Sequence, residues 1–150
     1  TVLFERFTRI LVYISKNYRE KISISQLATE EHINKNYFSQ FISKTVFSSF
    51  SNMVNYTRCY NAEKMLLTTD KSVSDISFDC GFSDPKYFYS AFKTLWHKTP
   101  SQHRDMYRKY YEACLSESTT GKGSTDYCDE YATRMLGDYI VQWHLEKTLE

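Results

Sequence analysis

The 150-residue chain has few of the residues that make turns, with only 4 glycines and 2 prolines. A sheet-rich fold would need more turn residues to connect its strands, so this shortage favours helices. No hydrophobic run approaches the roughly 18 residues of a membrane-spanning helix, and there is no signal-like segment. We therefore expect no membrane association and a cytoplasmic location.

The chain also lacks the residue patterns of cofactor and catalytic sites. Its cysteines are widely separated, without a Cys-x-x-Cys pair, at Cys59, Cys80, Cys114 and Cys128. The four histidines show no ligand spacing with them, so we expect reduced, packed thiols, no metal site and no other cofactor. Paired-carboxylate motifs, glycine-rich phosphate loops and a cysteine in a nucleophile setting are missing too. We therefore expect no enzymatic activity.

What the chain does have is enough apolar material for a core, with 41% hydrophobic and 17% aromatic residues. Its net charge of +1 conceals an asymmetry. Residues 1–115 hold 16 Lys and Arg against 11 Asp and Glu, whereas residues 116–150 hold 3 against 7. A basic body with an acidic tail is typical of a polyanion-binding domain with an appended segment.

Part of the sequence occurs twice. Residues 23–28 (SISQLA) are echoed by residues 72–77 (SVSDIS), and residues 37–42 (YFSQFI) by residues 87–92 (YFYSAF). The offsets of 49 and 50 residues are nearly constant, and each copy predicts a short helix, a turn and a second helix. Two such units in one small chain predict a molecule that contacts something periodic, and duplex DNA is the obvious candidate.

Capping residues and apolar periodicity predict where the helices begin and end. Ser23 and Gln26 match a capping box, with Ile22 and Leu27 as its hydrophobic staple. Gly81 is expected to end its helix in a left-handed conformation. The other expected N-caps are Asn34, Ser72, Asp84 and Thr99, the last two followed by proline at the first helical position. The first helix is expected over about 4–18, and the last from Pro100 to about 115.

The second helix of each copy has an outward face without acidic residues. Amides, hydroxyls, lysines and tyrosines suit phosphates and base edges, whereas a merely solvated face usually mixes both charge signs. The outward residues of the first copy are Lys35, Asn36, Ser39, Gln40, Ser43 and Lys44. Those of the second copy are Pro85, Lys86, Tyr89, Ser90 and Lys93.

A longer pattern runs through the second copy: Ala62, Met65-Leu66-Leu67, Thr69-Asp70, Ile76, Gly81-Phe82-Ser83-Asp84, Tyr87-Phe88, Ala91-Phe92-Lys93, Pro100 and Arg104. The first copy carries related residues: Ile24, Leu27-Ala28, Tyr37-Phe38-Ser39 and Arg58. In order and spacing, these residues resemble the DNA-binding domain of the AraC/XylS family of bacterial transcription regulators. The resemblance covers about Ile10 to Tyr107.

The chain departs from the family pattern at its turns. His32, Phe47 and His97 stand where the family usually has turn glycines, and Glu31 replaces a usually apolar residue. Histidine adopts left-handed conformations better than most residues, whereas Phe47 is the least favourable replacement. We therefore expect a first motif that is looser than the second or different in turn geometry.

The resemblance implies an all-α fold of about seven helices within residues 1–115. It places one helix-turn-helix motif at about 23–44, a connecting helix at about 50–68 and a second motif at about 72–96. It also implies two recognition helices in successive major grooves on one face of double-stranded DNA, in a regulator expected to be an activator. RNA polymerase is then a further candidate partner.

In helix-turn-helix proteins the N-terminal part of the recognition helix reaches the bases. The expected base-contacting residues are Asn36, Ser39, Gln40, Pro85, Lys86, Tyr89 and Ser90. The expected phosphate contacts are Lys35, Lys44, Lys93, Tyr37 and Tyr87, although packing explains the two tyrosines nearly as well. Arg58 is expected to tie the connecting helix to a carbonyl or a carboxylate, with Asp75 as one candidate. Arg104 is expected to support packing.

The alternative function is a helical protein-interaction module. Residues 116–125 are expected to form a flexible linker, and residues 126–150 an amphipathic helix. Its apolar stripe consists of Tyr127, Tyr131, Met135, Tyr139 and Trp143. This segment, over 126–147, has three open roles: self-association, folding back over the body, or covering the DNA-binding face with its acidic charge.

Overall fold

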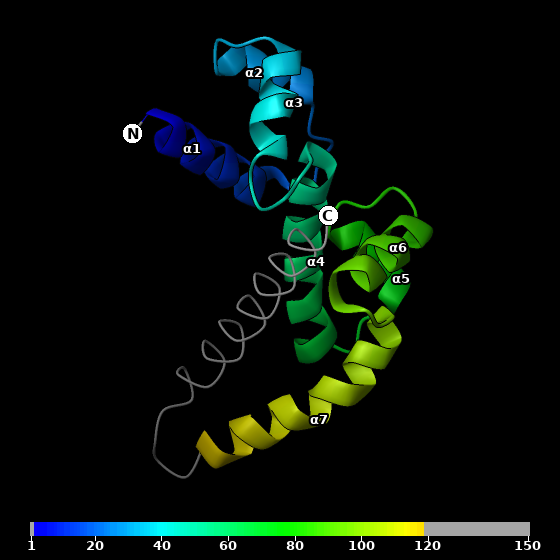
Figure 1. Cartoon of the computed structure of the whole chain (residues 1–150). Coiled ribbons are helices and arrows are strands. Elements are labelled where there is room, and N and C mark those ends of the chain that lie inside the picture. Colours follow the sequence, from blue (N-terminus) through cyan, green and yellow to red (C-terminus); the bar gives the residue numbers. More distant parts are fainter. Residues whose placement is uncertain (1, 119–150) are drawn as a thin grey trace.

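The computed structural model describes residues 2–118, which form seven helices and no strand (Figure 1). The helices are α1 (Val2–Asn17), α2 (Ile24–Glu30), α3 (Lys35–Ser43), α4 (Phe50–Thr68), α5 (Val73–Asp79), α6 (Pro85–Trp96) and α7 (Pro100–Ser118). The expected all-α fold class is confirmed. The expected tail helix and most of the expected linker lie outside the described residues, and α7 continues through residues 116–118, three residues past its expected end.

The repeat extends further than the sequence pattern indicates, because three helix starts of each copy are capped by a side chain at the equivalent position. Ser23 and Ser72 accept from the amides of the residues three positions on, at 3.3 and 3.1 Å. Asn34 and Asp84 cap α3 and α6. Ser49 and Thr99 cap α4 and α7 at an offset of 50 residues. Helix α4 therefore closes the first unit as α7 closes the second.

Two capping boxes differ from expectation. Only half of the Ser23–Gln26 box forms, because the Gln26 side chain donates to Glu30 at 3.2 Å instead of reaching back. The complete box is at the start of α7: Thr99 accepts from the Gln102 amide at 3.2 Å, and the Gln102 side chain accepts from the Thr99 amide at 3.0 Å. The T-x-x-Q pattern that signals it is visible in the sequence.

The turns of the two motifs have the same hydrogen-bond pattern despite their different residues. His32 and Gly81 both have positive φ, at 57° and 94°. The amide of the next residue bonds back to Ala28 in the first turn and to Ser77 in the second, both at 3.0 Å. This six-to-one bond is the Schellman pattern that ends a helix. The first turn therefore keeps this hydrogen-bond pattern despite the loss of glycine.

The turn after α3 differs in geometry from the turn after α6, as expected from the replacement of a turn glycine by Phe47. Phe47 is buried in the first core, and the neighbouring Ser48 has the positive φ of 64°. An aromatic ring gains more by packing against Phe7 and Tyr56 than it would in a strained turn, and the small serine takes the left-handed position. His97, in contrast, does adopt the left-handed conformation at the end of α6, with φ 56°.

Each unit has its own core, and α4 contributes to both. The first cluster gathers around Ile10, Ile14, Phe38 and Ile42, and the second around Leu66, Ile76, Phe88 and Phe92. Helix α4 contacts α1, α3, α5, α6 and α7. Figure 1 shows α2 and α3 near the start of α4, with α5 and α6 beside its later part. One continuous helix thus holds both motifs.

Candidate nucleic-acid interface

Helix α3 begins where the Asn34 side chain accepts from the Tyr37 amide at 2.7 Å. Its buried face, Phe38 and Ile42, packs into the first core. The expected contact residues lie on the exposed surface of this motif: Lys35, Asn36, Tyr37, Ser39, Gln40 and Lys44. Spacings of three and four residues bring Asn36, Ser39 and Gln40 to one face of the helix.

The polar ends of these α3 side chains are unengaged. Within residues 2–118, the side chains of Asn36, Ser39 and Gln40 make no hydrogen bond and no ion pair. Asparagine and glutamine amides each present donors and an acceptor, which can pair with two atoms of one base edge. This face therefore has the chemistry and the accessibility that base readout needs.

Helix α6 presents the equivalent face in the second unit. Its Asp84 cap accepts from the Lys86 amide at 2.9 Å, and Phe88 and Phe92 anchor the helix in the second core. The exposed residues are Lys86, Tyr87, Tyr89, Ser90 and Lys93, whereas Pro85 is only half-exposed. Lys86 lies over the Tyr87 ring, with its Nζ 5.1 Å from the ring centre. The second face is therefore cationic and aromatic where the first is rich in amides.

The first turn is held by ion pairs in place of apolar packing. Glu31 accepts from Arg9 in a bidentate arrangement at 3.0 and 2.7 Å, and Arg6 lies 3.4 Å away. The hydrogen bonds from Arg9 hold the pKa of the Glu31 carboxyl below its usual range. Arg6 and Arg9 come from α1, so this cluster ties α1 to the turn before α3. An acidic residue at a usually apolar position was the signal in the sequence.

The second turn is held by apolar contacts. Cys80, which corresponds to Glu31, is fully buried, with its Sγ 3.7 Å from the Met65 Sδ. Burial raises the pKa of the Cys80 thiol to about 11 and raises that of Cys59 as well. Both are free thiols. Among residues 2–118 no group of three or more His, Cys, Asp or Glu could hold a metal ion, and no helix is long and apolar enough to cross a membrane.

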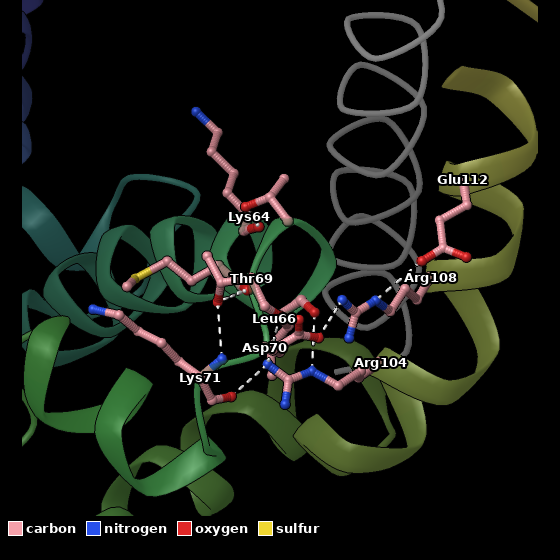
Figure 2. Close-up of polar contacts among 10 residues, drawn as sticks. Lys64, Leu66, Thr69, Asp70, Lys71, Arg104, Arg108 and Glu112 are labelled. Atoms are coloured by element: carbon pink, nitrogen blue, oxygen red, sulfur yellow. Dashed lines mark hydrogen bonds and ion pairs between the residues drawn. The ribbon is translucent and has the colours of Figure 1, made fainter. Parts of the chain in front are cut away.

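Two arginines fasten the segments that lead into the motifs. Arg58 donates to the carbonyls of Tyr18 and Glu20, both at 2.8 Å. Its partners are therefore carbonyls, and Asp75 is not among them. Arg104 is confirmed as a structural residue, because it donates to backbone carbonyls at the end of α4. Figure 2 shows its guanidinium directed at the carbonyls of Leu66, Thr69 and Lys71.

The chain contains two tandem helix-turn-helix units, and the second helix of each has an exposed face without acidic residues. These features place it among the helix-turn-helix proteins. The family model described as "Helix-turn-helix domain" matches residues 27–106. The chain belongs to this family, in its AraC-type branch. The expectation from the sequence pattern is thereby confirmed.

Known proteins resemble the chain over two thirds of its length or more. An uncharacterized HTH-type transcriptional regulator of Staphylococcus aureus (strain COL) is 26% identical over 138 residues, 92% of this chain but only 18% of that protein. A transcriptional regulator from Chromobacterium violaceum with an AraC-type DNA-binding domain has the same fold, with a TM-score of 0.63 and 22% identity, covering 69% of this chain and 92% of that one.

A third likeness is to the DNA-binding domain of AdpA, a global transcriptional factor solved in complex with a target DNA. The TM-score is 0.59 at 22% identity, over 72% of this chain and 94% of that one. This likeness shows a shared fold.

Proposed function

We propose that this chain is a sequence-specific double-stranded DNA-binding module of a bacterial transcription regulator, with α3 and α6 in successive major grooves on one face of the duplex. The observation that carries the proposal is the pair of exposed helix faces, free of acidic residues and repeated in register on two motifs. The major groove admits a helix and displays a distinct pattern of donors and acceptors for each base pair.

The two faces suit different bases. Asn36 and Gln40 can pair bidentately with adenine, while Lys86 can approach the acceptors of guanine and Tyr89 can contact a thymine methyl with its ring. Ser39 and Ser90 read less specifically, and Pro85 contributes shape. The operator is therefore expected to have two different half-sites.

Phosphate contacts fix the register of the protein on the duplex. Lys35, Lys44 and Lys93 are exposed and supply the positive charge, with the amides at the helix N-termini and the exposed Tyr37 and Tyr87 hydroxyls beside them. If about six phosphates are neutralised, the logarithm of affinity falls with the logarithm of salt concentration at a slope near −5.

The wider assignments follow from this role. We propose an activator that acts in the cytoplasm, binds RNA polymerase as a second partner and self-associates through residues 126–147. A binding role also agrees with the lack of catalytic motifs in the sequence. Removal of residues 119–150 tests the tail. A full-length chain with the molar mass of a dimer and a shortened chain with that of a monomer would support self-association. An increased DNA affinity of the shortened chain would support masking of the DNA-binding face.

The experiment for the main proposal starts from a duplex selected out of a random pool by the domain. Fluorescence anisotropy then gives its affinity at several salt concentrations, with and without nonspecific competitor DNA. The proposal expects the selected duplex to bind about a thousandfold more tightly than the competitor, at the low end of specific recognition. Equal affinity for both would overturn it and favour a protein-interaction module.

A further inference from the structure

The segment that joins α1 to α2 belongs to the first unit in sequence but contacts the second in space. Tyr18 directly follows α1, yet it packs against the second core cluster and not the first. The backbone of Tyr18 and Arg19 lies directly against the turn at Gly81. The first unit is thus in contact with the turn of the second motif.

Gly81 permits this approach because it has no side chain. A Cβ atom at this position would collide with the carbonyl oxygen of Tyr18 and would lie 2.9 Å from the Arg19 Cα. The atoms in the way are backbone, which cannot move aside as the end of a side chain can. His32, at the equivalent turn of the first motif, also has a positive φ, and its side chain is exposed. Glycine is therefore needed at this turn for two reasons: it permits the close contact between the units, and it adopts the positive φ.

Arg58, in α4, contacts both sides of this junction. Its guanidinium donates to the carbonyls of Tyr18 and Glu20, and it also lies over the ring of Phe82, with its Cζ 5.7 Å from the ring centre. Phe82 is the buried residue that follows Gly81 in the second turn. One half-buried side chain thus touches the joining segment of the first unit and the turn of the second.

We propose that Tyr18, Arg58 and Gly81 form a junction that fixes the relative position of α3 and α6, and so determines which spacing of DNA half-sites the chain accepts. The inference rests on the proposed DNA-binding function. A stiff junction makes the second recognition helix dock at a high effective concentration once the first is bound, but only when the half-sites match its geometry. A loosened junction loses that advantage and tolerates other spacings. These three are positioning residues and need not touch DNA.

The first experiment measures spacing preference. The selected duplex is remade with one or two base pairs inserted or deleted between the half-sites, and with each half-site scrambled in turn. Arg58→Ala and Gly81→Ala should lower affinity for the intact site by about tenfold and flatten the dependence on spacing. Their affinities for duplexes with a single half-site should stay within about twofold of wild type, because each motif keeps its own contacts.

Two variants serve as matched controls. Arg104→Ala removes hydrogen bonds to carbonyls within the second unit, and His32→Ala alters a positive-φ turn that faces solvent. Both should keep the spacing preference of the wild type. If Arg58→Ala and Gly81→Ala also keep it, or if Arg104→Ala flattens it equally, the junction is overturned. Circular dichroism checks folding, and Arg58→Lys, which keeps the charge but not the planar fork, replaces Arg58→Ala if that variant unfolds.

A second experiment needs no DNA. Spin labels at Ser25→Cys in α2 and Ser74→Cys in α5, with Cys114 and Cys128 changed to serine, report the distance between the motifs by pulsed electron paramagnetic resonance. The distribution should be narrow in the wild-type background and broad with Arg58→Ala or Gly81→Ala. Unchanged distributions would overturn the junction. If no duplex binds above competitor, the DNA-binding proposal fails while this measurement still decides the junction.

Discussion

Arg58 in α4 and Arg104 in α7 make similar contacts in the two units, although they stand at different positions along their helices. Each donates through Nε to a carbonyl at or near the end of the preceding long helix, Tyr18 after α1 and Leu66 in α4, at 2.8 and 2.9 Å. Each also donates to carbonyls in the segment that follows. The last carbonyls of a helix have no intrahelical partner, so a charged fork that satisfies them sets the exit direction of the chain. In each unit an arginine thus fastens the chain where a long helix ends.

Substitution should change stability much more at the second turn than at the first. Gly81→Ala should destabilise the protein by about 2–4 kcal/mol, because positive φ and a backbone collision combine. His32→Gly should stay within about 1 kcal/mol of wild type, because relief of a left-handed histidine offsets the greater freedom of the unfolded chain. Urea denaturation gives both values. Equal effects at the two turns would contradict the assigned contact at Gly81.

The ion pairs of Glu31 should make the first motif sensitive to acid. Because Arg9 depresses the pKa of this carboxyl in the folded state, the carboxylate stabilises the fold above its ordinary pKa of about 4.5, and this contribution is lost as pH falls through the lower folded value. Glu31→Gln should cost about 1 kcal/mol near pH 7. Denaturation curves of the two proteins should converge between about pH 5 and pH 3. A difference that is independent of pH would exclude the ion pair as its source.

Base and phosphate contacts should separate in mutant binding. Gln40→Ala should relax preference at particular bases, by about 1–3 kcal/mol, and leave binding to other sequences unchanged. Lys44→Ala should weaken binding to all sequences and reduce the salt slope by about one. Gln26→Ala on α2 and Lys64→Ala on α4 are the matched amide and charge controls. If Gln40→Ala weakened binding to all sequences equally, Gln40 would not be a base-contacting residue.

The buried thiols should be inert while the protein is folded. Cys59 and Cys80 have no solvent exposure, and burial raises their pKa, so both remain protonated near neutral pH. With Cys114 and Cys128 changed to serine, a thiol-specific reagent at pH 8 should label neither residue until denaturant is added. Fast labelling of the native protein would show that the second core opens readily.

Local features of the fold were readable in the sequence, whereas contacts between units were not. The caps at Ser23, Asn34 and Ser72 and the left-handed Gly81 depend on neighbours a few residues away, and each was predicted correctly. The carbonyl partners of Arg58 lie 40 and 38 residues away, so no local pattern could select them over Asp75.

The burial of Phe47 was another contact that could not be predicted from the sequence. Its place in the turn followed from the family pattern, but the gain from burying an aromatic ring moved the strained conformation to Ser48. The outward faces of α3 and α6 were predicted from helical periodicity, and their exposure follows from the burial of Phe38 and Phe88 on the opposite side. Which bases and phosphates these faces contact stays a prediction.

Hydroxyl-radical footprinting of the selected duplex tests most directly whether both helices read one face of DNA. We predict two protected patches on the same face, with centres about 10 base pairs apart, one weakened most by Gln40→Ala and the other by Lys86→Ala. A single patch, or two patches that weaken equally with either variant, would contradict paired docking of α3 and α6.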